Sequence, residues 1–429
     1  MLIIFILGYF IIALEHPLKI DKAAPALIIG SLSWTILMLG IDGIFPSQDY
    51  HFIIHELKHH LVDIAEILFF LLGAMTIVEL VDAHQGFKII TDKINTKNKI
   101  KLIWILSIIS FFFSATLDNL TTAIVMGALL TKIMKDKNDL WFFGGVIIIA
   151  ANAGGAWSPI GDITTIMLWI GGQVSALNII TSIIIPSIVC ILVPLIIISL
   201  TMKGDVTIVE KNTSIEHIKN PTSKIERNLI FYMGVLGLLF VPVFKTITHL
   251  PPYLGMLLSL SVLWLTTEIL HRSKNHEQKS NLTVIHVLKK IDTPTIFFFL
   301  GILLAVSALQ TAGHLDQVAI ALDKYFEGNI YYINIIIGIL SAIVDNVPLV
   351  AGAMGMYSME IFPQDHNFWE FLAYCAGTGG SVLIIGSAAG VAMMGILKID
   401  FIWYMKKISL LAFIGYIAGC LTYILLNPL

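Results

Sequence analysis

The chain of 429 residues is 57% hydrophobic and only 13% charged, and its mean hydropathy is +0.87. This composition excludes a water-soluble globule of that length and predicts a protein of the lipid bilayer. Helices are the expected spanning elements, because the apolar runs are long and lack the alternation of barrel strands. The net charge of −3 says little about partners, since in membrane proteins the distribution of Lys and Arg is the informative quantity.

Long apolar segments follow one another along the whole chain. Residues 2–14 could be read as a signal peptide, but no small-residue cleavage site follows them, so we expect a first, short span. Two polar linkers, at residues 202–228 and 272–292, interrupt the series, and the first divides the chain near its middle. The predicted apolar segments are residues 2–14, 24–45, 61–84, 101–134, 140–172, 176–201, 229–247, 251–271, 293–312, 330–358, 368–397 and 402–426.

The two halves of the chain repeat the same local patterns in the same order. Residues 114–119 match residues 341–346 around an Asp-Asn pair, and residues 70–73 match residues 298–301. A glycine pair followed by a third glycine also occurs in both halves, and three collinear matches favour an internal repeat over chance similarity. The predicted parts are an N-terminal part at residues 1–60, repeat 1 at residues 61–201, a cytoplasmic linker at residues 202–228 and repeat 2 at residues 229–427.

The distribution of lysine predicts how the segments are oriented. Both loops that flank residues 101–134 are rich in lysine, so both ends of this segment are expected on the cytoplasmic side. Its two arms, of about 16 residues each, are too short for two comfortable spans, which predicts a re-entrant hairpin with its tip near the middle of the membrane. Acidic stretches flank residues 330–358, so this second hairpin is expected to enter from outside. The repeats are therefore predicted to be inverted, with both chain termini outside.

Each predicted hairpin has an Asp-Asn pair at its tip. Asp118 and Asp345 lie in otherwise apolar segments, where an ionised carboxylate is costly unless it is paired or solvated, so a function is the default interpretation. The alternative is a carboxylate that is satisfied by helix N-termini or by a lysine elsewhere in the chain. Asn119 and Asn346 each add a neutral carbonyl oxygen, and hard cations such as Na⁺ prefer oxygen ligands of mixed charge. The sequence therefore predicts Na⁺ binding at both tips.

Residues 140–172 and 368–397 are each predicted to form a transmembrane helix that is broken in the middle. Glycine pairs and, in the first segment, a proline interrupt a long apolar run, and unwound backbone of this kind can face a cavity. Asp162 of the first segment corresponds to Ser387 of the second, so the halves are chemically unequal. Close helix packing is the alternative for the second segment. The predicted supporting ligands are Thr121, Thr122, Asn152, Ser158, Thr164, Thr165, Thr378, Ser381 and Ser387.

Other titratable residues lie between residues 51 and 84. Glu79 and Asp82, one helical turn apart near the cytoplasmic end of residues 61–84, could line a proton path or merely extend to the interface. Several histidines recur at helical spacing on an outward amphipathic stretch, where they could sense pH or bind a metal, and a solvated face is the simpler interpretation. These histidines are His51, His55, His59 and His60.

The motifs at residues 114–123, 151–165 and 342–349 resemble those of the NhaD type of bacterial sodium/proton antiporter, within the ion transporter superfamily. The resemblance extends from about residue 61 to the C-terminus, and the middle motif is the most specific. It implies exchange of Na⁺ and Li⁺ for H⁺, without a cofactor, across the cytoplasmic (inner) membrane of a bacterium. It also implies a fold similar to that of dicarboxylate transporters of the same superfamily, which commonly pair as homodimers.

Those dicarboxylate transporters have Ser-Asn-Thr at the hairpin tips, where this chain has Asp-Asn, and the difference favours a cation cycle without an organic anion. A carboxylate that loses water in the membrane binds protons more readily, while Na⁺ favours its charged form, so the two ions compete for one site. Competition combined with alternating access gives antiport. We expect Asp118 and Asp345 to be the exchange carboxylates, with Asp162 as a third candidate.

Several other functions are compatible with the sequence. The nearest are an arsenite/antimonite-type efflux permease and a sodium-coupled carboxylate importer of the same superfamily. An anion importer should have a cationic anchor within the membrane, whereas Lys and Arg lie almost wholly at segment ends. A channel is disfavoured, because inverted repeats with broken helices favour alternating access. An enzyme is not expected, because no His-Glu-x-x-His, Gly-x-Ser-x-Gly or comparable motif occurs. The expected partners are the bilayer, Na⁺, Li⁺ and H⁺, and not nucleic acid.

Overall fold

The computed structural model describes residues 1–13, 18, 20–91, 96–207, 222–272, 274, 282–343 and 345–428. Over these ranges the regular structure is helical, with one isolated antiparallel bridge between Asn98 and Asp205. Eight of the described helices are long and apolar enough to cross a membrane, which confirms an all-helical, multi-pass membrane protein. They are α5 (Tyr50–Ala83), α7 (Lys99–Leu117), α9 (Lys137–Ala156), α11 (Ala176–Thr201), α12 (Lys224–Thr248), α13 (Pro252–Leu270), α16 (Thr293–Thr311) and α23 (Ser409–Leu426).

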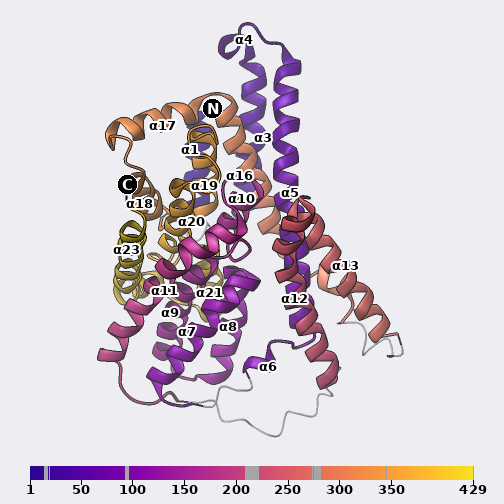
Figure 1. The fold of residues 1–429 in the computed structure, drawn as a ribbon, viewed down its shortest axis with the longest axis vertical. Coiled ribbons are helices and arrows are strands. Elements are labelled where there is room, and N and C mark those ends of the chain that lie inside the picture. The colour runs from indigo at the N-terminus through magenta and orange to yellow at the C-terminus, as the bar shows by residue number, and fades with distance from the viewer. Residues whose placement is uncertain are drawn as a thin grey trace.

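The N-terminal part is built around one long helix. In Figure 1, α3 (Ala23–Leu39) and α5 rise side by side to the short α4 (Ile41–Ile44) at the top of the view. Helix α5 has 34 residues, so the predicted amphipathic stretch and the predicted span after it form a single helix that crosses the expected boundary at residue 60. Helix α1 (Leu2–Ala13) has only 12 residues. At about 1.5 Å per residue it rises roughly 18 Å, which is less than the hydrocarbon core of a bilayer.

Both predicted hairpin tips lie between two apolar helices. The first lies between α7 and α8 (Asn119–Ile133), where Asp118 alone forms the turn at φ +80°. Its carboxylate caps α8 by accepting a hydrogen bond from the Thr121 backbone N–H at 2.7 Å. The second lies between α18 (Ile330–Leu340) and α19 (Asn346–Met356), and Asp345 caps α19 by accepting from the Val347 N–H at 3.2 Å. Residue 344, in the predicted second hairpin, lies outside the described residues.

Both segments that were predicted to be broken helices are interrupted. Helix α9 ends at Ala156 and α10 (Ile163–Ile170) follows, with Asp162 as the N-cap that accepts from the Thr164 N–H at 2.9 Å. Likewise, α20 (Asn367–Gly379) ends before α21 (Ala388–Leu397), and the Ser387 hydroxyl caps α21. A second break follows, because α21 and α22 (Phe401–Lys407) are bent by 115°.

The matched residues of the two halves make matched contacts. The Ser114 hydroxyl donates to the Ala151 carbonyl at 2.5 Å, and the Ser341 hydroxyl donates to the Ala376 carbonyl at 2.8 Å. The glycine pairs also behave alike, because a Cβ on the second glycine of either pair would collide with the carbonyl oxygen of the third glycine. The sequence similarity between the halves is therefore also a similarity of local structure.

The helices differ in the fraction of each span that is buried within the protein. In α9, 83% of the span is buried within the protein, against 28% in α12 and in α13. Helix α9 is therefore central, whereas α12 and α13 lie at one side of the molecule (Figure 1). The remaining short helices are α6 (Lys88–Thr91), α15 (Val284–Leu288) and α17 (His314–Tyr325), of which α6 lies at the bottom of Figure 1 and α17 near the top. Of the two predicted linkers, residues 208–221 and 275–281 lie outside the described residues.

Candidate functional site

The break between α9 and α10 is where both tips meet. Asp162, only 1% exposed, accepts hydrogen bonds at 2.9 Å from the backbone N–H and the hydroxyl of Thr164. Its carboxylate also accepts from Asn119 Nδ2 of the first tip at 2.6 Å and from Asn346 Nδ2 of the second tip at 3.5 Å. Asp162, the third candidate from the sequence, is thus the carboxylate that connects the two halves.

Asn152 of α9 connects this centre to the second broken helix. The fully buried side chain accepts from Asn119 Nδ2 at 3.1 Å. It donates to the Ser381 hydroxyl at 2.9 Å and to the Ser387 hydroxyl at 2.8 Å. Ser387 occupies the position that corresponds to Asp162, so the network unites the two unequal break points. Buried polar groups are usually satisfied in this way, and such a network fixes the geometry of its members.

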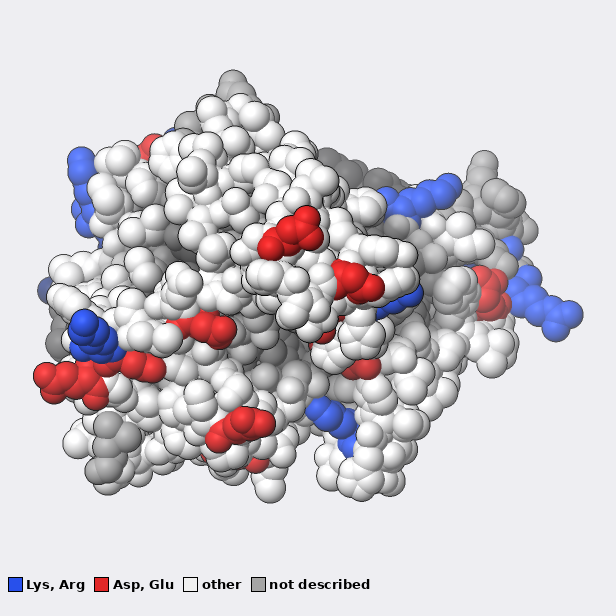
Figure 2. All heavy atoms as spheres, turned by 90° about the horizontal axis from the view of Figure 1, so that it is seen from above, with Lys and Arg blue, Asp and Glu red and all other residues white. Residues whose placement is uncertain are grey.

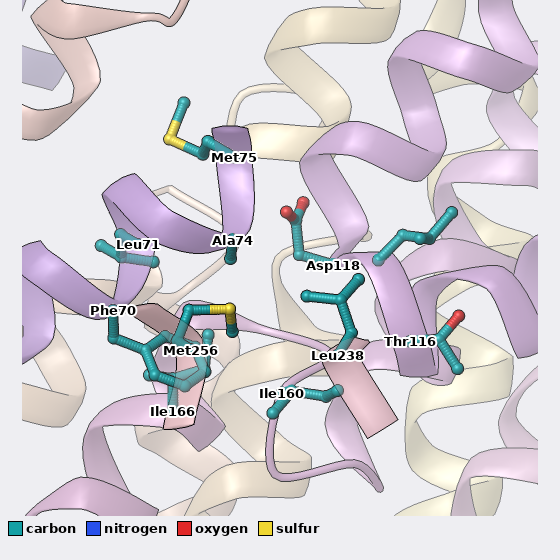
Figure 3. Close-up of a pocket in the computed structure, with 11 residues that line it drawn as sticks. Phe70, Leu71, Ala74, Met75, Thr116, Asp118, Ile160, Ile166, Leu238 and Met256 are labelled. Carbon is teal, nitrogen blue, oxygen red and sulfur yellow. The ribbon is translucent and has the colours of Figure 1, made fainter. Parts of the chain in front are cut away.

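Asp118 lies on the other side of the first tip, next to a small cavity. Its carboxylate accepts from the Thr121 N–H at 2.7 Å and from the Thr121 hydroxyl at 2.9 Å. Figure 3 shows the carboxylate pointing toward the part of α5 that contains Ala74 and Met75. The cavity measures about 20 Å³, enough for one water molecule or a small ion. Its lining residues are Phe70, Leu71, Ala74, Met75, Thr116, Leu117, Asp118, Ile160, Ile166, Leu238 and Met256.

Asp345 has a different environment, because a lysine neutralises it. Lys22 Nζ donates to Asp345 Oδ2 at 2.9 Å, and the two side chains are 19% and 14% exposed. The same ammonium group lies 4.3 Å above the centre of the Phe298 ring. For Asp345, the alternative that a lysine elsewhere in the chain satisfies the carboxylate is therefore realised. The sequence analysis missed Lys22 because it stands at the edge of an apolar segment, where a lysine usually reaches the interface.

The other predicted ligands divide into two groups. The Ser158, Thr165 and Thr378 hydroxyls donate to backbone carbonyls at 2.5 to 2.8 Å, so they fix the chain around the breaks. Thr122 is buried, and no hydrogen-bond partner of its hydroxyl is found among the described residues. Together with the Thr164 hydroxyl, it offers a neutral oxygen beside the first tip.

Glu79 and Asp82 lie away from the central network, toward the lower end of α5. Glu79 Oε1 lies 3.6 Å from Lys290 Nζ, and both side chains are partly exposed. Asp82 is exposed. An exposed ion pair of this kind contributes little and is typical of an interface with water.

The predicted histidine cluster lies on the upper part of α5. His59 Nδ1 is 3.8 Å from an Asp63 carboxylate oxygen, and His60 Nε2 is 3.2 Å from the Thr311 hydroxyl. His59, His60 and Asp63 offer three ligand atoms within 4.8 Å of one another, while His51 and His55 are exposed. Among the described residues, no hydrogen bond or ion pair joins this cluster to the central network, so the cluster is separate from that network.

Long apolar helices, with carboxylates and amides held at helix breaks inside them, define an integral membrane protein of the transporter class. A family model described as a citrate transporter matches residues 2–370. The chain is 46% identical to "Sodium/proton antiporter 1" of Arabidopsis thaliana over all of this chain and 72% of that protein. It is 30% identical to "Na(+)/H(+) antiporter NhaD" of Vibrio cholerae over 99% of this chain and 91% of that protein.

A second protein of Arabidopsis thaliana, "Sodium/proton antiporter 2", is 43% identical over 99% of this chain and 98% of that protein. These similarities extend over nearly the whole chain and confirm the resemblance that the three motifs indicated. The chain belongs to the NhaD-type family of sodium/proton antiporters, which is a family of transporters and not of enzymes.

Proposed function

We propose that the protein exchanges Na⁺, and also Li⁺, for H⁺ across a membrane. The observation that carries this proposal is the Asp162 carboxylate, which is buried between one asparagine of each tip, with a second carboxylate, Asp118, on the other side of the first tip. Such a group is costly in the membrane unless it binds a proton or a metal cation. The oxygens around it are of the type that Na⁺ prefers.

In this proposal Asp118, Asp162 and Asp345 are the exchange carboxylates. Na⁺ binds to the charged form and a proton to the neutral form, so neither ion can bind while the other occupies the same carboxylate. Amide oxygens of Asn119, Asn152 and Asn346 and threonine hydroxyls complete the ligand set. Asn152 joins Asn119 of the first tip to Ser381 and Ser387 of the second broken helix. No cofactor takes part.

We further propose that the halves are inverted repeats with re-entrant hairpins, and that alternating access moves the tips around Asp162. The matched contacts of the two halves support the repeat. The helices α8 and α19 have 15 and 11 residues. They rise roughly 22 and 16 Å, too little to cross the hydrocarbon core, as one arm of a re-entrant hairpin requires. Helix α7, with 19 residues, is by itself long enough to span, so in the first hairpin the length argument applies to α8 alone.

The orientation follows the distribution of charge. Lysine-rich loops flank α7 and α8 at the lower end of Figure 1, which we assign to the cytoplasm. Figure 2 shows the opposite end, where Asp and Glu side chains lie across the middle and Lys and Arg lie mostly toward the edges. Both termini lie in the upper part of Figure 1, on the side that we assign to the outside.

We place the protein in the cytoplasmic membrane of a bacterium, as the Vibrio cholerae relative suggests, and propose that it pairs as a homodimer. The relatives from Arabidopsis thaliana, at 46% and 43% identity, are plant proteins and do not support a bacterial location. Glu79 and Asp82 are retained as a proposed proton entry path at the cytoplasmic end of α5.

Transport of a carboxylate such as citrate is the second candidate, because the matching family model is described as a citrate transporter. Within the part of the chain that the structure describes, Lys22 is the one lysine that forms an ion pair at a tip, and Asp345 neutralises it. The centre of the site therefore holds carboxylates and no surplus positive charge, and carboxylates repel an anionic substrate. This arrangement of charges favours transport of a cation over transport of a carboxylate.

The test uses everted membrane vesicles with an imposed pH gradient, followed by fluorescence dequenching. NaCl, LiCl, KCl, arsenite and citrate are added in separate runs. Dequenching by NaCl and LiCl that Asp162→Asn abolishes would support the proposal. Asp139→Asn is the matched control, since it also replaces a paired carboxylate, 2.6 Å from Lys99, but at the end of α9. No response to Na⁺ at any pH, or a response to citrate or arsenite alone, would reject it.

A further inference from the structure

Each tip carboxylate has a phenylalanine beside it at matching positions of the two halves. Residues 70–73 match residues 298–301 in sequence, and the first phenylalanine of each set lies beside a tip carboxylate. Phe70 of α5 lines the cavity that contains Asp118. Phe298 of α16 lies under the Lys22 ammonium group that binds Asp345. Thus Phe70 faces a cavity in the first half, whereas the matching Phe298 faces a lysine in the second half.

The helices behind these walls correspond as well. A Cβ on Gly73 of α5 would contact Met256 of α13, and a Cβ on Gly301 of α16 would collide with the backbone of Ala26 in α3. Helix α13 therefore packs on α5 as α3 packs on α16. Met256 lines the Asp118 cavity, and Lys22 lies one helical turn before Ala26. The cavity beside Asp118 and the Lys22 ammonium group beside Asp345 consequently occupy equivalent positions in the two halves.

We propose that Lys22 is a tethered cation that competes with Na⁺ for Asp345, and that its ammonium group takes at the second tip the position that a transported cation takes beside Asp118. This inference rests on the proposed exchange function and adds a residue that determines which cation binds at one of its carboxylates. An ammonium group suits this role, because it is a compact charge on a flexible stem.

The Lys22 ammonium group has two partners at once, because it binds Asp345 while it lies 4.3 Å from the centre of the Phe298 ring. When Na⁺ takes its place at Asp345, the attraction of the ring face for a cation still holds the ammonium group nearby. The other titratable groups around the pair are the buried Tyr9 hydroxyl of α1, the Asp21 carboxylate, which accepts from the Ala23 N–H at the start of α3, and Asp162. Among these groups Lys22 is the only base.

The competition predicts a pair of opposite changes when the charge of Lys22 is removed. In Lys22→Gln, Na⁺ no longer displaces an ammonium group, so its KM at alkaline pH should fall about tenfold. Protons lose the same competitor, so the acid limb of the pH profile should move upward by about one pH unit. Lys22→Arg keeps the charge and should keep both quantities close to those of the wild type.

The experiment measures the Na⁺ KM and the pH profile in everted vesicles for the wild type, Lys22→Gln and Lys22→Arg. Lys99→Gln is the matched control, because it removes a lysine from an ion pair of similar length outside the site. In addition, the melting temperature of each purified variant is measured with Na⁺ and with choline, since this reports Na⁺ binding without turnover. Should Lys22→Gln not accumulate, Lys22→Met, which keeps an apolar stem over Phe298, takes its place.

Asp345→Asn separates a direct competition from a structural effect. In this background Lys22→Gln should not change the Na⁺-dependent melting shift any further. An unchanged KM and pH profile in Lys22→Gln, or an equal shift with and without the Asp345 carboxylate, would overturn the inference. The same change in Lys99→Gln would also overturn it. Failure of the wild type to respond to Na⁺ would instead reject the proposed function, so the two failures are distinguishable.

Discussion

The two tips of this protein have the same Asp-Asn pair and different surroundings. At the first tip, Asp118 caps α8, accepts from Thr121 and faces a small apolar cavity. At the second tip, Asp345 caps α19 and binds Lys22. Between them, Asp162 receives an asparagine from each side. Equal motifs therefore do not imply equal roles, because residues outside the motif decide how each charge is compensated.

The largest effect is expected for the carboxylate that the tips share. Asp162→Asn removes a buried charge that both Asn119 and Asn346 contact, so Na⁺-driven dequenching should be lost. A contact with a charged group contributes up to about 3 kcal/mol, and the neutral amide gives up this contribution to a bound cation. That corresponds to roughly a hundredfold loss of apparent Na⁺ affinity. Transport by Asp162→Asn within a few-fold of the Asp139→Asn control would show that the shared centre is not the ion site.

The next largest effect is expected on stability, which should differ between variants of the two tip aspartates. Asp345→Asn removes the carboxylate that compensates the charge of Lys22, and breaking a partly buried pair in this way should cost about 3 kcal/mol or less, since the pair retains some contact with solvent. In Asp118→Asn, no positive charge among the described residues loses a carboxylate partner. The melting temperature of this variant should therefore equal or exceed that of the wild type.

The measurement is the melting temperature of the purified proteins, with transport assayed in parallel. Adding Lys22→Gln to Asp345→Asn should restore part of the lost stability, because the positive charge that lost its carboxylate partner is then also removed. Equal melting temperatures of Asp118→Asn and Asp345→Asn would contradict the difference between the tips.

A smaller effect is expected from making the first tip resemble the second. In the register that matches Phe70 with Phe298, Ala74 corresponds to Ile302, which is fully buried. Ala74→Ile should fill the cavity beside Asp118 and raise the Na⁺ KM by about tenfold, since overpacking costs about 1–3 kcal/mol. The reciprocal Ile302→Ala, away from that cavity, is the control and should leave the KM unchanged while lowering stability. An unaltered KM in Ala74→Ile would exclude the cavity as a cation position.

The smallest effect is expected at the lower end of α5. Glu79 forms a partly exposed ion pair with Lys290, and such pairs contribute about 1 kcal/mol or less. Glu79→Gln should therefore change the Na⁺-driven rate in vesicles by less than about threefold. A much slower rate at unchanged Na⁺ KM would instead support the proposed proton path through Glu79 and Asp82, and would add a third functional region to the two tips.

Much of the fold follows from local sequence patterns. The apolar segments agree with the described helices, and the interruptions at residues 157–162 and 380–387 occur where glycines and a proline weaken the helix. The amphipathic α17 was missed, because only apolar segments were sought, and the continuity of α5 was missed because its histidine-rich start is polar. The residues of the central network were all among the predicted ligands, but their arrangement was not predicted, and Lys22 was missed. Asp162 was ranked below the tip aspartates although it is central.

By itself, the sequence determined that this is a multi-pass helical membrane protein, where its helices break, and which buried carboxylates and amides are candidate ligands. These properties depend on hydropathy, on helix-breaking residues and on the cost of a charge in lipid, which act along the chain. Only the tertiary structure decided that Lys22 neutralises Asp345, 323 residues away, and that Asn119 and Asn346 converge on Asp162. Charge compensation depends on distance in space, and packing of α3 against α16 brings that lysine to its partner.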